Sequence, residues 1–165
     1  MKSATIKQLK DELNRLEKDE VVKLTLRLAR SRKDAKELLT YLLFESHDEH
    51  QYVETIKQEI SEEFAEINPA SVYYAKKSVM RIHRKLGKQI RYSGEKATKV
   101  ELLMHFCECL AKARFRFTHS RVLTNLYVRQ LKAIDTAMKG LHEDLQYDYK
   151  DRRSQLSVYL GAGAG

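Results

Sequence analysis

The sequence predicts an all-α fold of seven or eight antiparallel helices, and three observations lead to this prediction. Only one proline and three glycines precede the last five residues, whereas a sheet-rich chain would need a turn about every ten residues. Apolar residues recur at intervals of three and four, as on one face of a helix. Three pairs have the spacing of a capping box, in which two side chains satisfy the first backbone N–H groups of a helix: Thr5 and Gln8, Ser46 and Glu49, Thr98 and Glu101.

Three short helices are expected before residue 45. The first begins after the Thr5 cap. Asp19 is expected to cap a second helix that reaches about Arg30, and Asp34 a third that spans residues 35–44. The spacing predicts that the third helix buries four leucines: Leu38, Leu39, Leu42 and Leu43.

A long acidic helix and a long basic helix are expected next. The acidic helix begins at the Ser46 cap and ends at Ile67, and residues 45–68 carry eight acidic groups and one basic group. Proline is favoured as the first residue of a helix, so the basic helix is expected to start near Pro69, and it reaches about Tyr92. Residues 69–100 carry nine basic groups and one acidic group, so two helices of opposite charge follow each other directly.

Three further helices complete the expected fold, at about 99–114, 121–139 and 142–158. The first of them is apolar nearly all round, which is typical of a helix at the centre of a bundle. Its few polar residues fall on one narrow stripe, and they are Glu101, His105, Glu108 and Lys112.

Length and composition indicate one helical domain over residues 1–160, followed by a flexible Gly/Ala tail at 161–165. Charged residues make up 33% of the chain, which is typical of a protein outside the membrane. Two cysteines cannot build a disulfide framework, and the sequence therefore predicts a cytoplasmic protein.

An internal repeat is a second way to describe the chain. Ser31–Glu45 is similar to Ser93–Glu108, and the match suggests two stacked three-helix units at about 19–67 and 71–139. The alternative is that helices rich in Leu, Lys and Glu look alike by chance. The run Val21–Ser46 also resembles stretches of small all-helical bacterial proteins of unknown function, and this resemblance implies no activity and no site.

The basic helix carries the main candidate for function. Five of its residues, called here the basic stripe, recur at spacings of four, three, four and three: Lys77, Arg81, Arg84, Lys88 and Arg91. Such a stripe could track nucleic-acid phosphates, with Tyr73, Tyr74 and Tyr92 stacking on bases. Alternatively, the neighbouring acidic helix neutralises it within a hairpin. We expect a non-enzymatic protein-interaction or adaptor module with a basic helix. The alternative is sequence-independent nucleic-acid backbone binding through residues 76–91.

Other patterns are weaker candidates for chemistry. The segment Arg114–Arg121 alternates bases with aromatic residues, which suits either a stacking patch or a link anchored in the core. His47, His50 and Glu54 resemble part of a metal site, but further ligands are missing. Cys107 and Cys109 diverge on a helix and are expected to be structural thiols. No nucleophile motif occurs, so we expect no catalytic residues, no metal and no cofactor.

Overall fold

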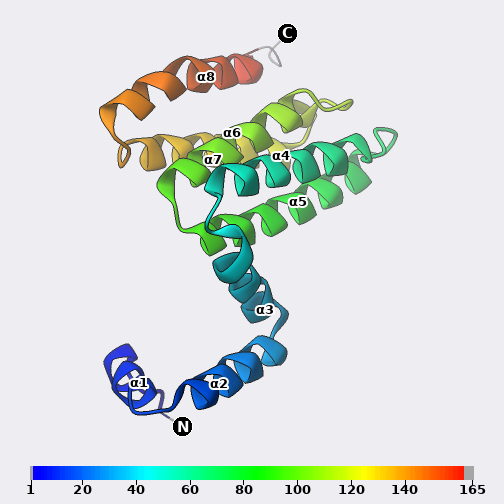
Figure 1. The fold of residues 1–165 in the computed structure, drawn as a ribbon. Helices are drawn as coiled ribbons and strands as arrows, with labels where there is room; N and C mark the ends of the chain where they lie inside the picture. The colour runs from blue at the N-terminus through cyan, green and yellow to red at the C-terminus, as the bar shows by residue number, and fades with distance from the viewer. Residues whose placement is uncertain (1, 162–165) are drawn as a thin grey trace. The chain divides into compact units, whose positions relative to one another are not determined.

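A computed structural model describes residues 2–161 and confirms the all-α prediction. Eight α-helices, a π-helix and a 3-10 helix occur within that range, and no strand occurs in it (Figure 1). The chain divides into two compact units, residues 1–44 and 45–165, which we call the N-terminal and C-terminal units. The prediction of a single domain over residues 1–160 stays a prediction.

The N-terminal unit contains α1 (Ile6–Leu13), α2 (Lys18–Ser31) and α3 (Lys33–Thr40). The Thr5–Gln8 capping box is confirmed, because Thr5 N–H donates to Gln8 Oε1 at 2.9 Å and Gln8 N–H donates to Thr5 Oγ1 at 3.3 Å. The predicted Asp19 cap is wrong. The helix begins at Lys18, because the Glu20 carboxylate accepts the backbone N–H of Glu17 at 3.1 Å.

The third helix also differs from its prediction. It begins at Lys33, before the expected Asp34 cap, and continues as a short π-helix, η1 (Tyr41–Glu45). Its leucines are not buried. Leu38, Leu42 and Leu43 expose 37%, 54% and 62% of their surface, and Leu39 is half-buried. Within this unit α3 packs on α2 and is only two turns long, so one neighbour cannot cover its apolar face.

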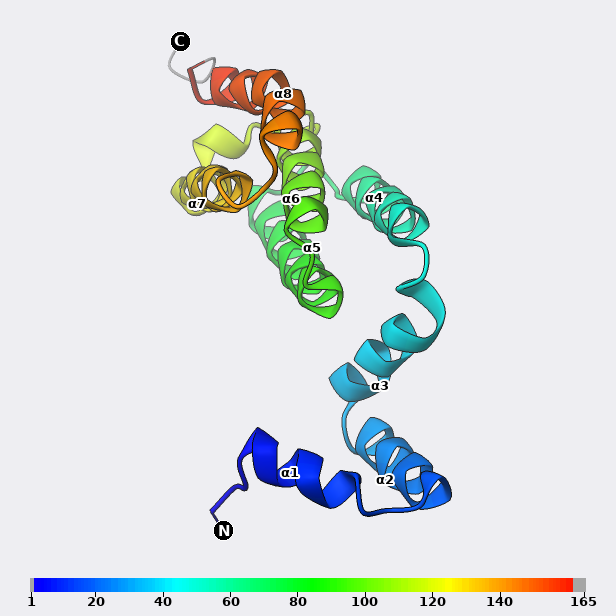
Figure 2. The same cartoon turned by 60° about the vertical axis from the view of Figure 1, so that its left-hand side comes forward.

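The C-terminal unit contains α4 (Glu49–Ala65), α5 (Val72–Ser93), α6 (Lys96–Ala111), η2 (Phe117–His119), α7 (Arg121–Met138) and α8 (Glu143–Gly161). The central position expected for the apolar helix is confirmed, since α6 packs against α4, α5, α7 and α8. Figure 2 shows α6 in the middle of this unit, with α4 on one side and α7 on the other. Its buried core residues are Val100, Leu102, Leu103, Met104, Phe106, Cys107 and Leu110.

The acidic and basic helices form with shifted ends. Asp48, not Ser46, caps α4, because its Oδ1 accepts the backbone N–H of Gln51 at 3.0 Å. The basic helix begins at Val72 instead of Pro69, because Asn68 Oδ1 accepts the N–H of Ala70 at 2.9 Å and holds residues 68–70 in a turn. Its predicted end is confirmed, since Gly94 adopts the left-handed conformation with φ +73°.

The Thr98–Glu101 capping box is wrong. The central helix begins at Lys96, so Thr98 lies inside it, where the residue is 3% exposed and its hydroxyl donates to Glu49 Oε1 at 2.5 Å. This hydroxyl therefore joins α6 to α4. A hydroxyl that could serve as a cap thus forms a tertiary contact, which spacing alone does not reveal.

The two segments of the suggested repeat adopt different structures. Ser93–Glu108 belongs mostly to the buried helix α6, whereas Ser31–Glu45 covers α3 and η1 and is largely exposed. The repeat stays a prediction. The last helix extends to Gly161, the first residue of the expected tail, and residues 162–165 lie outside the described residues. Among residues 2–161, no helix has the length and apolar character needed to cross a bilayer.

Candidate functional site

The basic stripe lies on α5, and its five members have different surroundings. Arg81 lies 3.8 Å from the carboxylate of Glu63 on α4. The ammonium of Lys77 lies 5.2 Å from the centre of the Tyr73 ring, a cation–π arrangement. Arg84 and Arg91 are exposed, and in the described part of the chain neither has an ion-pair partner. Lys88 is half-buried and has partners of its own.

The acidic helix neutralises one edge of the basic helix, and Lys85 is the main contact. Its ammonium lies 2.9 Å from Glu59 and 2.8 Å from Glu63. Burial disfavours the charged ammonium, but hydrogen bonds to Glu63 and Glu59 outweigh it, so the pKa of Lys85 is raised. The hairpin interpretation therefore holds for Lys85 and for Arg81, while Arg84 and Arg91 form no ion pair with the described residues of α4.

Two tyrosines extend the basic stripe at the start of α5. Tyr73 and Tyr74 expose 57% and 64% of their surface, and their rings meet edge to face at 5.4 Å. Exposed aromatic rings beside lysines could stack on bases. Tyr92, the third candidate, is half-buried near the other end of the helix and makes further contacts. The structure thus leaves two of the three aromatic candidates accessible.

The link between α6 and α7 is anchored in the core. Phe117 is 4% exposed and stacks on Tyr127 at a ring distance of 4.7 Å, and Phe115 is half-buried. Arg114 and Arg116 are exposed beside them. Phe117 therefore packs the fold, and its ring is not open to a ligand.

An ion network covers the polar stripe of α6, and sequence analysis missed its partners. Lys57 on α4 lies 2.5 Å from Glu101, and Arg152 on α8 lies 2.7 Å from the same carboxylate. Arg152 also binds Glu108 with two nitrogens, at 2.5 and 3.1 Å. Burial opposes ionisation of Glu101, but the hydrogen bonds from Lys57 and Arg152 outweigh it and lower its pKa. This stripe therefore carries the charges that tie α4 and α8 to the central helix.

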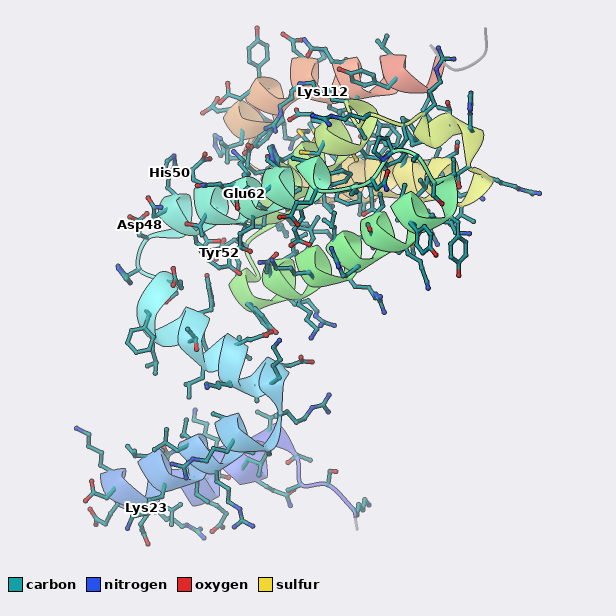
Figure 3. All side chains as sticks on the ribbon, turned by 90° about the vertical axis from the view of Figure 1, so that its right-hand side faces the viewer. Lys23, Asp48, His50, Tyr52, Glu62 and Lys112 are labelled. Carbon is teal, nitrogen blue, oxygen red and sulfur yellow. The ribbon has the colours of Figure 1, made fainter. Side chains whose placement is uncertain are left out.

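A cavity of about 310 Å³ opens beside this network. It lies between the first turns of α4, where Asp48 and His50 are labelled in Figure 3, and the facing parts of α6 and α8. Tyr149 lines it, and burial together with the nearby Glu101 carboxylate raises the pKa of this tyrosine to about 12. The remaining lining is mixed: Glu49, His50, Val53, Glu54, Lys57, Ala97, Thr98 and Glu101.

A second cavity, of about 370 Å³, brings Ser61, His105 and Cys109 together near Lys112, which Figure 3 labels. His105 Nε2 lies 2.9 Å from Ser61 Oγ, 3.0 Å from the Lys57 carbonyl oxygen and 3.5 Å from Cys109 Sγ. Burial raises the pKa of Cys109 and lowers that of His105. A neutral thiol beside a neutral imidazole is the opposite of an activated thiolate. This group therefore has the character of a packing contact.

The partial metal motif is not assembled. His47 precedes α4, which begins at Glu49, so His47 and His50 do not share a helix face as the spacing indicated. Among residues 2–161, no three His, Cys, Asp or Glu side chains form a group that could hold a metal ion. Cys107 is fully buried and Cys109 half-buried, and both are free. Burial raises the pKa of Cys107 to about 12.

The N-terminal unit presents the largest set of exposed apolar side chains. Among its described residues only Tyr41 is buried. Twelve large apolar side chains, which we call the N-terminal apolar face, are each at least 37% exposed: Ile6, Leu9, Leu13, Leu16, Val22, Leu24, Leu26, Leu28, Leu38, Leu42, Leu43 and Phe44. Three of the twelve, Leu38, Leu42 and Leu43, were predicted from their spacing to be buried.

Comparisons with known proteins give no functional information. No family model, no curated protein and no solved structure matches the chain.

Proposed function

We propose that the chain is a non-enzymatic helical interaction module that binds protein through its N-terminal apolar face. One observation carries the proposal, namely that twelve large apolar side chains stay exposed within the described residues 2–44. Scattered exposed leucines are ordinary in a monomeric protein. A unit in which only one described side chain is buried, and twelve large apolar ones are exposed, is unusual for a monomer. A protein partner would remove this surface from water.

The short length of α1 supports the same conclusion. It has eight residues, and isolated helices shorter than about 12–15 residues are marginal in water. Ile6, Leu9 and Leu13 share its apolar side and expose 81%, 48% and 42% of their surface. Packing against a partner would supply the stabilisation that this helix does not obtain from its own length.

A cytoplasmic location belongs to the proposal. Cys107 and Cys109 are both free, and unpaired thiols are usual in proteins of reducing compartments.

Site-specific photo-crosslinking tests the proposal. A benzophenone amino acid replaces Leu28, which is 66% exposed on the apolar face, and the matched control replaces Val158, which is 67% exposed on α8. We expect discrete protein adducts from position 28 that disappear when Leu24→Glu is added, and none from position 158. The absence of discrete adducts at position 28, with purified chain and in cells of the source organism, would contradict the proposal.

Nucleic-acid backbone binding is a second candidate, favoured by the exposure of Arg84 and Arg91. It predicts binding with little sequence preference and a logarithmic affinity that falls by about 0.9 per neutralised phosphate with the logarithm of salt. Arg84→Glu with Arg91→Glu should then weaken binding and flatten the slope. The control is Lys132→Glu with Lys139→Glu, the same charge change at two exposed lysines of α7 and its C-cap. Equal loss in both double variants, or no binding in the parent, would eliminate this candidate.

A further inference from the structure

Four exposed side chains of α2 form a stripe that is complementary to itself. Asp19, Val22, Leu26 and Arg30 follow at spacings of three, four and four, so they share one side of the helix. An acid stands at the N-terminal end, two apolar residues in the middle and a base at the C-terminal end. We call these four residues the α2 stripe, and the exposed side chains of this helix, among them Lys23, can be followed in Figure 3.

An antiparallel copy of the same helix would match the α2 stripe to within one residue at every position. A two-fold axis near Leu24 and Thr25 places Asp19 of one chain opposite Arg30 of the other, and Val22 opposite Leu26. The two ion pairs would lie about 16 Å apart along the helix, from the rise per residue. Within residues 2–161, neither Asp19 nor Arg30 has an ion-pair partner, so both charges are available.

We propose that the partner of the N-terminal apolar face is a second copy of this chain, paired through antiparallel α2 helices. This inference rests on the proposed function and specifies its partner. The pairing is isologous, which is the commonest form of a homodimer. Antiparallel helices also bring the positive end of each helix dipole next to the negative end of the other.

The available apolar area fits a dimer. Leu24 and Leu28 lie on the opposite side of α2 from the stripe, and the exposed fractions of the other ten residues of the N-terminal apolar face amount to about five whole side chains, or roughly 300–600 Å² of apolar surface. A standard interface buries about 800 Å² per partner, of which about 450–520 Å² is apolar. The α2 stripe alone would be too small, so the apolar residues of α1, α3 and η1 contribute the remaining contact.

The charge pattern favours a second copy over a uniformly acidic partner. Residues 1–44 carry 11 basic and 7 acidic groups, and their net charge of +4 would attract acidic proteins. However, Glu17, Asp19 and Glu20 gather at the start of α2, where they would repel such a partner. An identical helix running the opposite way presents bases to these acids.

Sedimentation velocity on the full chain tests the proposal, from about 1 to 200 μM, which spans the affinities of weak and moderate dimers. We expect a concentration-dependent shift from 19.3 kDa to twice that mass. Leu26→Glu changes a side chain that is 44% exposed, so it should leave helicity and melting intact while weakening dimerisation at least tenfold. The matched control is Val158→Glu, which makes the same kind of change at an exposed apolar residue of α8 and should leave dimerisation unchanged.

A charge exchange tests the antiparallel register. Asp19→Arg and Arg30→Asp should each weaken the dimer, because each places like charges opposite one another. Both changes in one chain restore opposite charges and should recover the dimer. The helix dipole disfavours both substitutions, so a merely local effect would be larger in the double variant than in either single variant.

Each alternative outcome is distinct. A chain that stays monomeric at about 200 μM, or a dimer unaffected by Leu26→Glu, would overturn the inference. A benzophenone amino acid at position 26, on the α2 stripe itself, would overturn it by forming adducts to a different protein, yet such adducts would leave the proposed function in place. Failure of the charge exchange to restore the dimer would refute the antiparallel pairing.

Discussion

Removing the Arg152 guanidinium should destabilise the C-terminal unit more than any exposed ion pair would. Arg152→Ala leaves Glu108 without its guanidinium partner and Glu101 with Lys57 alone, and these two carboxylate side chains are only 23% and 18% exposed. Breaking a fully buried ion pair costs about 3–5 kcal/mol. Because these groups retain some solvent, we expect a loss of about 2–3 kcal/mol in the free energy of unfolding.

Thermal unfolding followed by circular dichroism measures this loss. For a unit of this size the melting temperature should fall by about 6–15 °C. The matched control is Arg153→Ala on the same helix. Arg153 binds Asp135 with two nitrogens, at 2.7 and 2.8 Å, but Asp135 is 48% exposed, so its loss should cost about 1 kcal/mol or less.

The pH dependence separates an ionic effect from lost packing. The pKa of Glu101 in the folded chain lies below its ordinary value of 4.5, so its ionised form contributes stability above pH 4.5 that is lost as the pH falls through the folded pKa. The difference between Arg152→Ala and the parent should therefore be largest near neutral pH and shrink in acid. A difference that does not shrink as the pH falls below 4.5, or an equal cost for Arg153→Ala, would refute this account of the network.

Three further changes test other parts of the C-terminal unit. Gly94→Ala should cost about 1 kcal/mol in urea unfolding, because φ is +73° there, although the space around it is open. Tyr127→Phe should cost about 1–3 kcal/mol by the same assay, since the buried Leu156 carbonyl loses the hydroxyl donor at 2.8 Å. Cys107 should resist iodoacetamide at pH 8 until the chain unfolds, and Cys109 should react more slowly than a free thiol, because burial raises the pKa of both. Rapid labelling of Cys107 in the folded chain would show that α6 is not buried as described.

Periodicity predicted the C-terminal unit well because its helices pack with neighbours on their apolar faces. The acidic helix buries Val53, Ile56, Ile60 and Phe64, which recur in the sequence at the spacing of one helix face. Helix starts were less predictable, since several side chains can cap the same helix. A capping box is recognised from only two residues. Thr98 shows that the hydroxyl of such a pair can bind a side chain on another helix instead of capping its own.

The candidate site could be predicted only in part, because its charges meet through tertiary structure. The basic stripe is evident in sequence, but which members are neutralised depends on where α4 lies. The polar stripe of α6 was visible as a spacing of four, three and four. Its partners Lys57 and Arg152 lie 44 or more residues from Glu101 along the chain, and nothing local connects them.

The N-terminal unit shows why an apolar helical face is not by itself evidence of a core. Leu38 and Leu42 have the same spacing as Ile56 and Ile60, yet the first two are exposed and the second two are 3% exposed. Sequence periodicity indicates that an apolar helix face is buried in the functional state. It does not indicate whether the surface that buries it belongs to the same chain. In the C-terminal unit, apolar residues at helical spacing are buried by neighbouring helices. In the described part of the N-terminal unit no other helix buries them, so there the same spacing predicts an interface. The α2 stripe adds what apolar periodicity lacks, because its order of acid, apolar residues and base defines a direction, and an antiparallel copy of the same helix reproduces it.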